Sequence, residues 1–261
     1  VRHDAYGGEG DIRSAADMID GYDRLYSHLV LWDRNKKEIA GSYRYIIPAR
    51  VEGGLKPSDL VTGSIFELRQ PFIDLLPQAL EVGRAAISNQ YQRSYAPLMM
   101  MWRGITDIMY RDSSIRYVIG PVTISQSFSA LSRHVLKRFL ERKCMNLALY
   151  DAARPYHEFN AAVAPEVDID ELVENADSLT DIACIIEALE GGRRKLPVLY
   201  RQYSNMGLKY VATGEWPELG NAMASLAVLD MSEAKPDFFA RYLGKDRVAG
   251  FLAERGMVSA A

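Results

Sequence analysis

Residues 80–105 constrain the fold most, because a strand pattern changes there to a helix pattern across one short polar loop. Residues 80–87 are apolar apart from Glu81, Gly83 and Arg84, and a second apolar run opens with Pro97. Proline is well tolerated in the first turn of a helix, so this run predicts a helix over residues 97–110. The chain is therefore expected to contain a strand that leads through a loop into a helix.

The same segment carries polar groups that suit an anionic ligand. Arg93 and Ser94 lie in the loop, and Glu81 and Arg84 stand on the strand, where apolar side chains are the default. A loop that leads into a helix N-terminus presents backbone N–H groups, which bind phosphate. These residues predict chemistry on a phosphate-bearing donor.

Composition excludes several classes of protein. With 261 residues, 48% of them hydrophobic, the chain can bury a full core. A net charge of −3 gives no basic footprint for nucleic acid. Two cysteines, Cys144 and Cys184, are too few for a disulfide framework or a metal cluster, so a reducing compartment is expected. No apolar run approaches the roughly 20 residues of a membrane span. We expect a cytoplasmic protein, soluble or peripheral at the inner face of the membrane.

Hydrophobic periodicity predicts alternating strands and helices. Strands are expected at residues 28–33, 39–47, 80–87, 117–124, 146–150, 209–212 and 226–229. Helices are expected at residues 97–110, 127–142, 169–174, 181–187 and 196–207, with a terminal helix at 237–256 broken at Gly244. Residues 14–26 have helical spacing interrupted by Gly21. This order predicts an α/β (α+β) fold, a mixed twisted sheet flanked by helices.

The domain organisation follows from the same pattern. Residues 1–150 are expected to form the core, residues 151–195 an acidic helical insertion, and residues 196–261 the completion of the core with a terminal helix. Together they are expected to form one domain. Because the sequence opens at Val1 without a methionine, an N-terminal strand or a further domain is expected upstream.

The order of several short motifs resembles the GNAT acyltransferase superfamily. The motifs are Asp20-Gly-Tyr-Asp23, Ser27-His-Leu-Val30, Gly41-Ser-Tyr-Arg-Tyr45, Phe66-Glu-Leu68, Glu81-Val-Gly-Arg84, Trp102-Arg-Gly-Ile105 and Leu196-Pro-Val-Leu-Tyr-Arg-Gln-Tyr203 with Gly207. Within it, the chain is similar to the hemolysin-like N-acyltransferases of ornithine lipids and related aminolipids, which take acyl groups from acyl carrier protein. Acyl-homoserine-lactone synthases are a sister family but normally lack the long segment after Asp151.

The resemblance implies where the donor binds. In this superfamily the strand that carries Glu81 splays from its neighbour and pairs with the donor's pantetheine arm, and Gly83 lets that arm approach closely. No permanently bound cofactor is implied; the donor is the acyl-phosphopantetheine of acyl carrier protein, or acyl-CoA. The residues expected at the donor are Gly83, Ala85, Arg93, Ser94, Ala96 and Arg103.

The resemblance also implies a catalytic pair, Glu81 and Arg84. An amine that attacks a thioester must lose a proton, and a carboxylate held near it can accept that proton. Glu81 is the candidate base. On a regular strand Glu81 and Arg84 point to opposite faces, so both reach one site only if the strand bulges.

Four residues are candidates for binding the acceptor, and each has a structural alternative. Arg44 either binds a carboxylate, that of the acceptor or of Glu81, or forms a surface ion pair. Asp20 and Asp23 either hold the acceptor's amine or cap a helix. His28 matches a family position, although a histidine at the start of a strand is more often structural.

We therefore expect transfer of a long acyl chain, plain or 3-hydroxylated, to the α-amine of a small amino acid, with ornithine first and glycine or another amino acid second. The alternatives are an autoinducer synthase of the homoserine-lactone type and a non-catalytic module that binds acyl carrier protein or lipid. Met99, Met100, Met101 and Trp102 could line an acyl tunnel, but helix-spaced residues of this kind usually belong to the core.

The expected protein partner is acidic acyl carrier protein, which requires a local basic surface. Peripheral membrane contact is expected because the product is amphiphilic. The best candidates for the basic surface lie on the helix at residues 127–142 and just beyond it, with a solvated helix face as the alternative: Arg133, Lys137, Arg138, Arg142 and Lys143.

Two other motifs are chance matches. His28 and Asp33 have the spacing of glycerolipid acyltransferases, but residues five apart on a strand face opposite sides. His157 and Glu158 lack the second histidine of a zinc-protease motif. No metal site is predicted.

Overall fold

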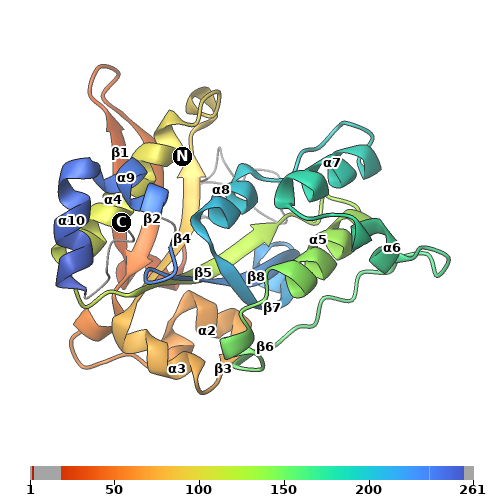
Figure 1. The fold of residues 1–261 in the computed structure, drawn as a ribbon, viewed down its shortest axis with the longest axis horizontal. Helices are drawn as coiled ribbons and strands as arrows, with labels where there is room; N and C mark the ends of the chain where they lie inside the picture. The colour runs from red at the N-terminus through yellow and green to blue at the C-terminus, as the bar shows by residue number, and fades with distance from the viewer. Residues whose placement is uncertain (1, 3–18, 235, 256–261) are drawn as a thin grey trace. The chain divides into compact units, whose positions relative to one another are not determined.

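The computed structural model of this chain describes Arg2, residues 19–234 and residues 236–255 (Figure 1). They fall into two units, and strand β5 (Tyr117–Ile124) runs from the first into the second. Unit 1 comprises the described residues of Val1–Leu55, Leu75–Ile119 and Asp230–Ala261. Unit 2 comprises Lys56–Asp74 and Gly120–Leu229.

Unit 1 contains a mixed sheet in the order β1-β2-β4-β5. Strands β1 (Ser27–Asp33) and β2 (Glu38–Ile46) form the predicted antiparallel hairpin, and β2 pairs antiparallel with β4 (Ala79–Ile87). Strand β4 pairs in parallel with β5, from Ala79 opposite Tyr117 to Glu81 opposite Ile119. The mixed, mostly antiparallel sheet confirms the predicted fold class.

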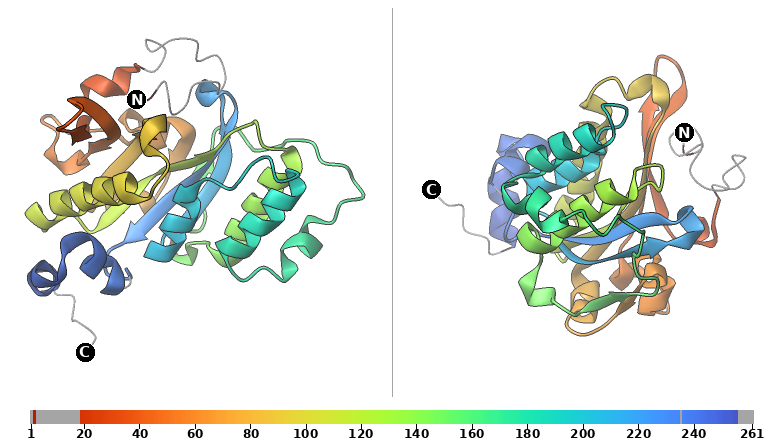
Figure 2. Two further views of the ribbon diagram at one scale, coloured as in Figure 1. Left: turned by 90° about the horizontal axis from the view of Figure 1, so that it is seen from above. Right: turned by 90° about the vertical axis from the view of Figure 1, so that its right-hand side faces the viewer.

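One face of this sheet is covered by α4 (Ala96–Arg111), which packs against β1 and β2 (Figure 2). Helices α9 (Pro236–Leu243) and α10 (Lys245–Glu254) lie beside α4 and are separated at Gly244, as predicted. Leu29 of β1 approaches α4 closely at Gly104, where a Cβ would lie 2.7 Å from the leucine side chain. A larger residue at position 104 would displace the end of the Leu29 side chain, so glycine favours this close approach of the helix to the sheet.

Unit 2 is built on the antiparallel pair β7 (Lys209–Trp216) and β8 (Ala222–Asp230), together with a short pair of β3 (Phe66–Leu68) and β6 (Ala153–Pro155). Helices α6 (Ile169–Glu174) and α7 (Leu179–Leu189) pack against α5 (Ala130–Lys143). Helix α8 ends at Gly207 in the left-handed conformation, as its sequence predicts. The helices of this unit are α2 (Val61–Ile65), α3 (Phe72–Leu75, which reaches into unit 1), α5 (Ala130–Lys143), α6 (Ile169–Glu174), α7 (Leu179–Leu189) and α8 (Val198–Met206).

One predicted strand is wrong. Residues 146–150 contain a 3-10 turn at Leu147–Leu149, with Leu147 82% exposed and Tyr150 66% exposed. An apolar run that is not buried gains little from a sheet, and Asp151 then turns the chain with a positive φ of 60°. In residues 14–26, where the helical spacing interrupted by Gly21 allowed two short turns, Gly21–Arg24 form a 3-10 helix and residues 14–18 lie outside the described residues.

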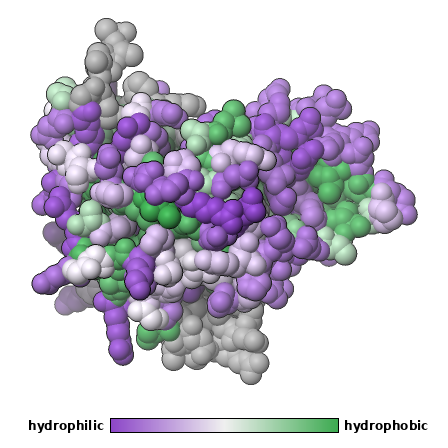
Figure 3. Space-filling view, turned by 90° about the horizontal axis from the view of Figure 1, so that it is seen from below, coloured by the Kyte–Doolittle hydropathy of each residue, from purple (hydrophilic) through white to green (hydrophobic). Residues whose placement is uncertain are grey.

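Hydrophilic side chains predominate on the face shown in Figure 3, and hydrophobic ones form separate patches. None of the helices in the described part of the chain is long and apolar enough to cross a bilayer.

Candidate active site

Glu81 lies on β4 in unit 1 and is almost completely buried, with 1% of its surface exposed. The hydroxyl of Tyr26 donates a hydrogen bond to Oε2 of Glu81. Tyr26 is itself buried and immediately precedes β1. A buried carboxylate must be hydrogen-bonded, so this contact fixes the orientation of the predicted base.

A β-bulge brings Arg84 to the same cluster. Arg44 of β2 pairs with Gly83 and Ser42 pairs with Ala86, so β4 holds one extra residue at this point. Arg84 has a positive φ of 52°, and its Nη2 donates to Oδ2 of Asp20 at 3.2 Å. The structure therefore contains the bulge that Glu81 and Arg84 need in order to reach one site.

Arg44 links the two sides of the cluster. Its Nη1 donates to Oδ1 of Asp20 and, at 3.2 Å, to Oδ1 of Asp23. Its guanidinium lies over the rings of Tyr22 and Tyr26, 5.5 and 5.1 Å from their centroids. Because only 1% of Arg44 is exposed, this is a buried ion-pair network, not a surface ion pair.

Asp20 also caps the 3-10 helix Gly21–Arg24, accepting from the N–H of Tyr22 at 3.0 Å. Asp23 accepts from the N–H of Asp20 at 3.1 Å. Both aspartates therefore cap the turn, which was the structural alternative, and pair with arginine at the same time.

Arg2 and His28 complete the outer side of the cluster. Arg2 donates from Nη1 to both oxygens of Asp23, at 2.7 and 2.9 Å, and its Nη2 lies 3.1 Å from Nδ1 of the more exposed His28. Burial raises the pKa of Asp23, but the hydrogen bonds from Arg2 and from the backbone of Asp20, with the charges of Arg2 and Arg44, outweigh it and hold that pKa below its ordinary value.

Among the described residues, the cluster contains three arginines and three carboxylates: Arg2, Arg44 and Arg84, and Asp20, Asp23 and Glu81. Asp20 and Asp23 are both bonded to guanidinium groups, and Glu81 accepts a hydrogen bond from the phenol of Tyr26. A carboxylate held beside a bound amine can accept the proton that the amine loses, and Glu81 is the carboxylate that β4 contributes to this cluster. This arrangement suits general-base chemistry.

The donor-side residues lie along β4, the following loop and α4. At Gly83 a Cβ would meet no atom within 4 Å, so space is open beside the strand. Helix α4 begins without a side-chain cap. Of the other predicted donor contacts, Arg93, Ser94, Ala96 and Arg103 are exposed and Ala85 is half-buried. The structure does not bring Arg93 or Arg103 into the ion-pair cluster, and their predicted contacts with the donor stay predictions.

The methionines and tryptophan of α4 divide between core and surface. Met101 and Trp102 are each 1% exposed, and Trp102 packs against Phe238 and Tyr242 at ring distances of 6.2 Å. Met99 and Met100 are 37% and 54% exposed. The prediction that these residues belong to the core is therefore correct for Met101 and Trp102 and wrong for Met99 and Met100.

The basic residues of α5, in unit 2, are largely paired with acids. Asp170 accepts from Arg138 at 2.5 and 2.9 Å and from Arg142 at 3.2 Å, while Lys143 pairs with Asp177 and Lys137 with Glu141. Arg133 is buried against the ring of Phe159, and that burial lowers its pKa. Much of the charge proposed for an acidic partner is therefore compensated within the chain.

Sequence reasoning missed Tyr26, Tyr22 and Arg2. The four-residue spacing of Tyr22 and Tyr26 was visible but indicated only a helix face. Nothing in the sequence pointed to Arg2, which pairs with a residue 21 positions away.

Comparison with known proteins supports an acyltransferase fold. Residues 1–103 match the family described as acetyltransferase (GNAT) domain. The chain is 28% identical over 148 residues to a glycine N(alpha)-acyltransferase of Bacteroides thetaiotaomicron, covering 53% of this chain and 43% of that protein. It is 29% identical over 155 residues to a glycine N(alpha)-acyltransferase of Phocaeicola vulgatus, covering 54% and 47%. The aligned regions thus span less than half the length of these relatives. No solved structure matches.

Proposed function

We propose that this chain is an N-acyltransferase that moves an acyl group from a phosphopantetheine thioester to the α-amine of a small amino acid. The observation that carries the proposal is Glu81, a buried carboxylate held by a phenol on a bulged strand beside open space at Gly83. The resemblance to the GNAT domain and to two glycine N(alpha)-acyltransferases supports it.

The chemistry requires one base and one electrophile. The amine nitrogen attacks the thioester carbonyl carbon, the carbon–sulfur bond breaks, and the proton lost by the amine passes through Glu81 to the departing thiolate. The donor arm lies along β4 at Gly83. The parallel pairing of β4 with β5 ends at Glu81, whereas β4 itself continues to Ile87. Backbone N–H groups of this part of β4 stabilise the oxyanion.

Glycine is the favoured acceptor. Asp20 and Asp23 already pair with arginines, so the cationic side chain of ornithine would have to compete with Arg44, Arg84 or Arg2 for a carboxylate. An acceptor without a charged side chain avoids that competition. The names of the two relatives point the same way. Ornithine, favoured by the resemblance of the motifs, is the second candidate, and the product is then a lyso-aminolipid.

The donor is the acyl group of acyl carrier protein, with acyl-CoA as the alternative. Both present the same thioester to β4 and differ in what lies beyond the phosphate. Acyl carrier protein fits the motif resemblance, and the exposed loop at Arg93 and Ser94 is accessible to its phosphate.

The test is product formation by mass spectrometry. The chain is incubated with acyl carrier protein or CoA carrying a long acyl group, together with glycine, ornithine or S-adenosylmethionine, beside Glu81→Gln and the exposed control Glu52→Gln. We expect an N-acyl amino acid whose formation falls about a hundredfold or more in Glu81→Gln and is unchanged in Glu52→Gln.

Other outcomes identify the alternatives. A lactone formed from S-adenosylmethionine would replace the proposal with an autoinducer synthase. Equal product in the wild type and Glu81→Gln would remove Glu81 as the base. Acyl-carrier binding without any product would leave a non-catalytic binding module.

A further inference from the structure

The β1–β2 hairpin of unit 1 exposes a row of apolar side chains. Leu29 points toward α4 at Gly104, so its neighbours in the strand alternate to the other face of the sheet. Val30 and Trp32 are 45% and 51% exposed on that face, and Ile39, the cross-strand partner of Trp32, is 42% exposed. Val30 and Trp32 lie on the edge strand β1 and Ile39 lies beside Trp32 on β2, so the three form an apolar patch on the hairpin, and exposed apolar patches mark interaction sites.

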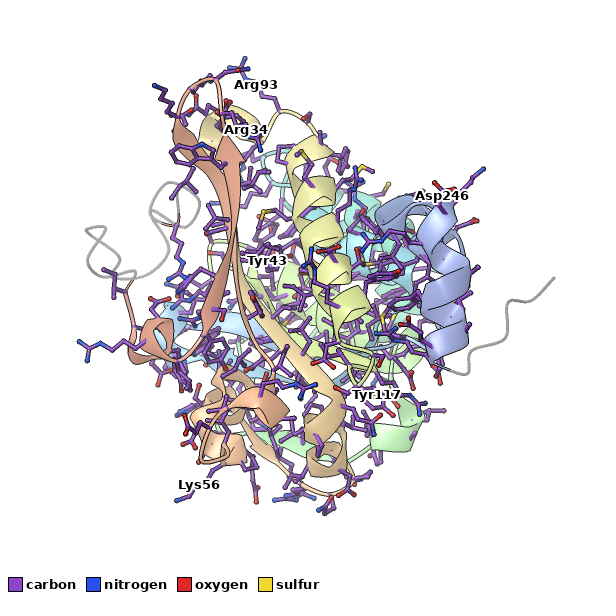
Figure 4. All side chains as sticks on the ribbon, turned by 90° about the vertical axis from the view of Figure 1, so that its left-hand side faces the viewer. Arg34, Tyr43, Lys56, Arg93, Tyr117 and Asp246 are labelled. Atoms are coloured by element: carbon purple, nitrogen blue, oxygen red, sulfur yellow. The ribbon has the colours of Figure 1, made fainter. Side chains whose placement is uncertain are left out.

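Basic residues flank this patch at the turn of the hairpin. The side chains of Arg34 and Lys37 are exposed, and neither makes a hydrogen bond or ion pair with the described part of the chain. Figure 4 shows Arg34 and Arg93 at the same end of the hairpin. Contact between the turn and the loop after β4 is direct, since Lys36 donates to the amide oxygen of Gln90 at 3.0 Å.

The acids of the turn are satisfied internally. The hydroxyl of Tyr91 lies 2.6 Å from Asp33 and 2.8 Å from Glu38, and the N–H groups of Asn35 and Lys36 also bond Asp33. The hydrogen bond from Tyr91 is the largest cause that holds the pKa of Asp33 below its ordinary value. The acidic groups of the turn are therefore paired with neighbouring groups of the chain, whereas the cationic side chains of Arg34 and Lys37 are exposed.

We infer that this hairpin patch, Val30, Trp32 and Ile39 with Arg34 and Lys37, docks on an anionic membrane surface. Tryptophan concentrates at the boundary between headgroups and hydrocarbon because its ring is apolar and its N–H is polar. Arginine and lysine beside it attract anionic headgroups. An acidic protein would satisfy the charges, but the apolar row matches the membrane boundary as well.

Tryptophan fluorescence tests the inference directly. All three tryptophans of the chain lie in described segments, and Trp32 is exposed whereas Trp102 and Trp216 are 1% and 8% exposed. Vesicles of phosphatidylglycerol and phosphatidylcholine in equal parts should shift the emission to shorter wavelength, and pure phosphatidylcholine vesicles should shift it much less. The variant Trp32→Tyr should still co-sediment with anionic vesicles but lose the shift.

Charge reversal provides the matched comparison. Each basic residue near an anionic leaflet strengthens binding about fivefold, so Arg34→Glu with Lys37→Glu should weaken co-sedimentation at least about thirtyfold. The control, Arg241→Glu with Lys245→Glu, reverses two exposed charges of unit 1 on helices α9 and α10 and should bind as the wild type.

Three results would overturn the inference. The first is the absence of any shift with anionic vesicles. The second is equal loss of binding in the Arg34/Lys37 pair and the control pair. The third is a fluorescence shift that appears with acyl carrier protein, or at a higher concentration of the chain itself, but does not appear with vesicles. None of these measurements uses catalysis, so failure here is separate from failure of the proposed function.

Discussion

Removal of the hydroxyl that holds Glu81 is the most direct probe of the site. Tyr26→Phe keeps the aromatic ring over Arg44, 5.1 Å from the guanidinium, and deletes the hydroxyl that donates to Oε2 of Glu81. A hydrogen bond to a charged group contributes about 1.5–3 kcal/mol, and Glu81 is 1% exposed, so water does not readily replace it. We expect the free energy of unfolding to fall by about 2 kcal/mol.

A double-mutant cycle separates this bond from its surroundings. The two positions are changed singly and together, with Tyr26→Phe and Glu81→Leu, and unfolding is followed in urea. Each single change removes this hydrogen bond together with whatever else that side chain contributes, and the cycle cancels the other contributions and leaves the energy of the pair. The coupling energy should therefore be about 2 kcal/mol. A coupling energy below about 0.5 kcal/mol would refute the claim that Tyr26 holds Glu81.

Three further predictions concern other parts of the chain. Hydrogen bonding from Arg50 is the largest cause that holds the pKa of Asp112 at about 2. The ionised carboxylate therefore stabilises the fold above about pH 4, and this stabilisation is lost as the pH falls toward 2. Asp112→Asn should lower Tm near neutral pH, and its Tm should approach that of the wild type at acid pH. Gly83→Ala should leave Tm nearly unchanged, because its Cβ meets no atom within 4 Å, but should raise KM for the acyl donor about tenfold; an unchanged KM would place the donor elsewhere. Gly214→Ala should lower the free energy of unfolding by about 2 kcal/mol or more, because its Cβ would lie 2.2 Å from another side chain. Gly250→Ala, in open space on α10, should raise it by about 0.5–1 kcal/mol. Chemical denaturation measures both changes.

Local sequence pattern predicted the strands and helices whose side chains are periodic and buried. The hairpin β1–β2, strand β5 and helix α4 lie where the pattern indicated. The failure at residues 146–150 has the opposite cause, because an apolar run alone does not say whether it is buried, and Leu147 is exposed. Similarly, β7 continues to Trp216, four residues beyond the predicted end, because pairing with β8 stabilises residues with weaker strand signals.

The sequence by itself determined five charged groups of the site: a carboxylate and an arginine on one strand, an arginine on its neighbour, and two aspartates before the hairpin. Tertiary structure decided how they meet. The bulge at Arg84 depends on the register between β2 and β4, and the bond from Tyr26 to Glu81 joins residues 55 positions apart. Neither is encoded by local periodicity, because both are set by which strands pair and which charges must be compensated once water is excluded.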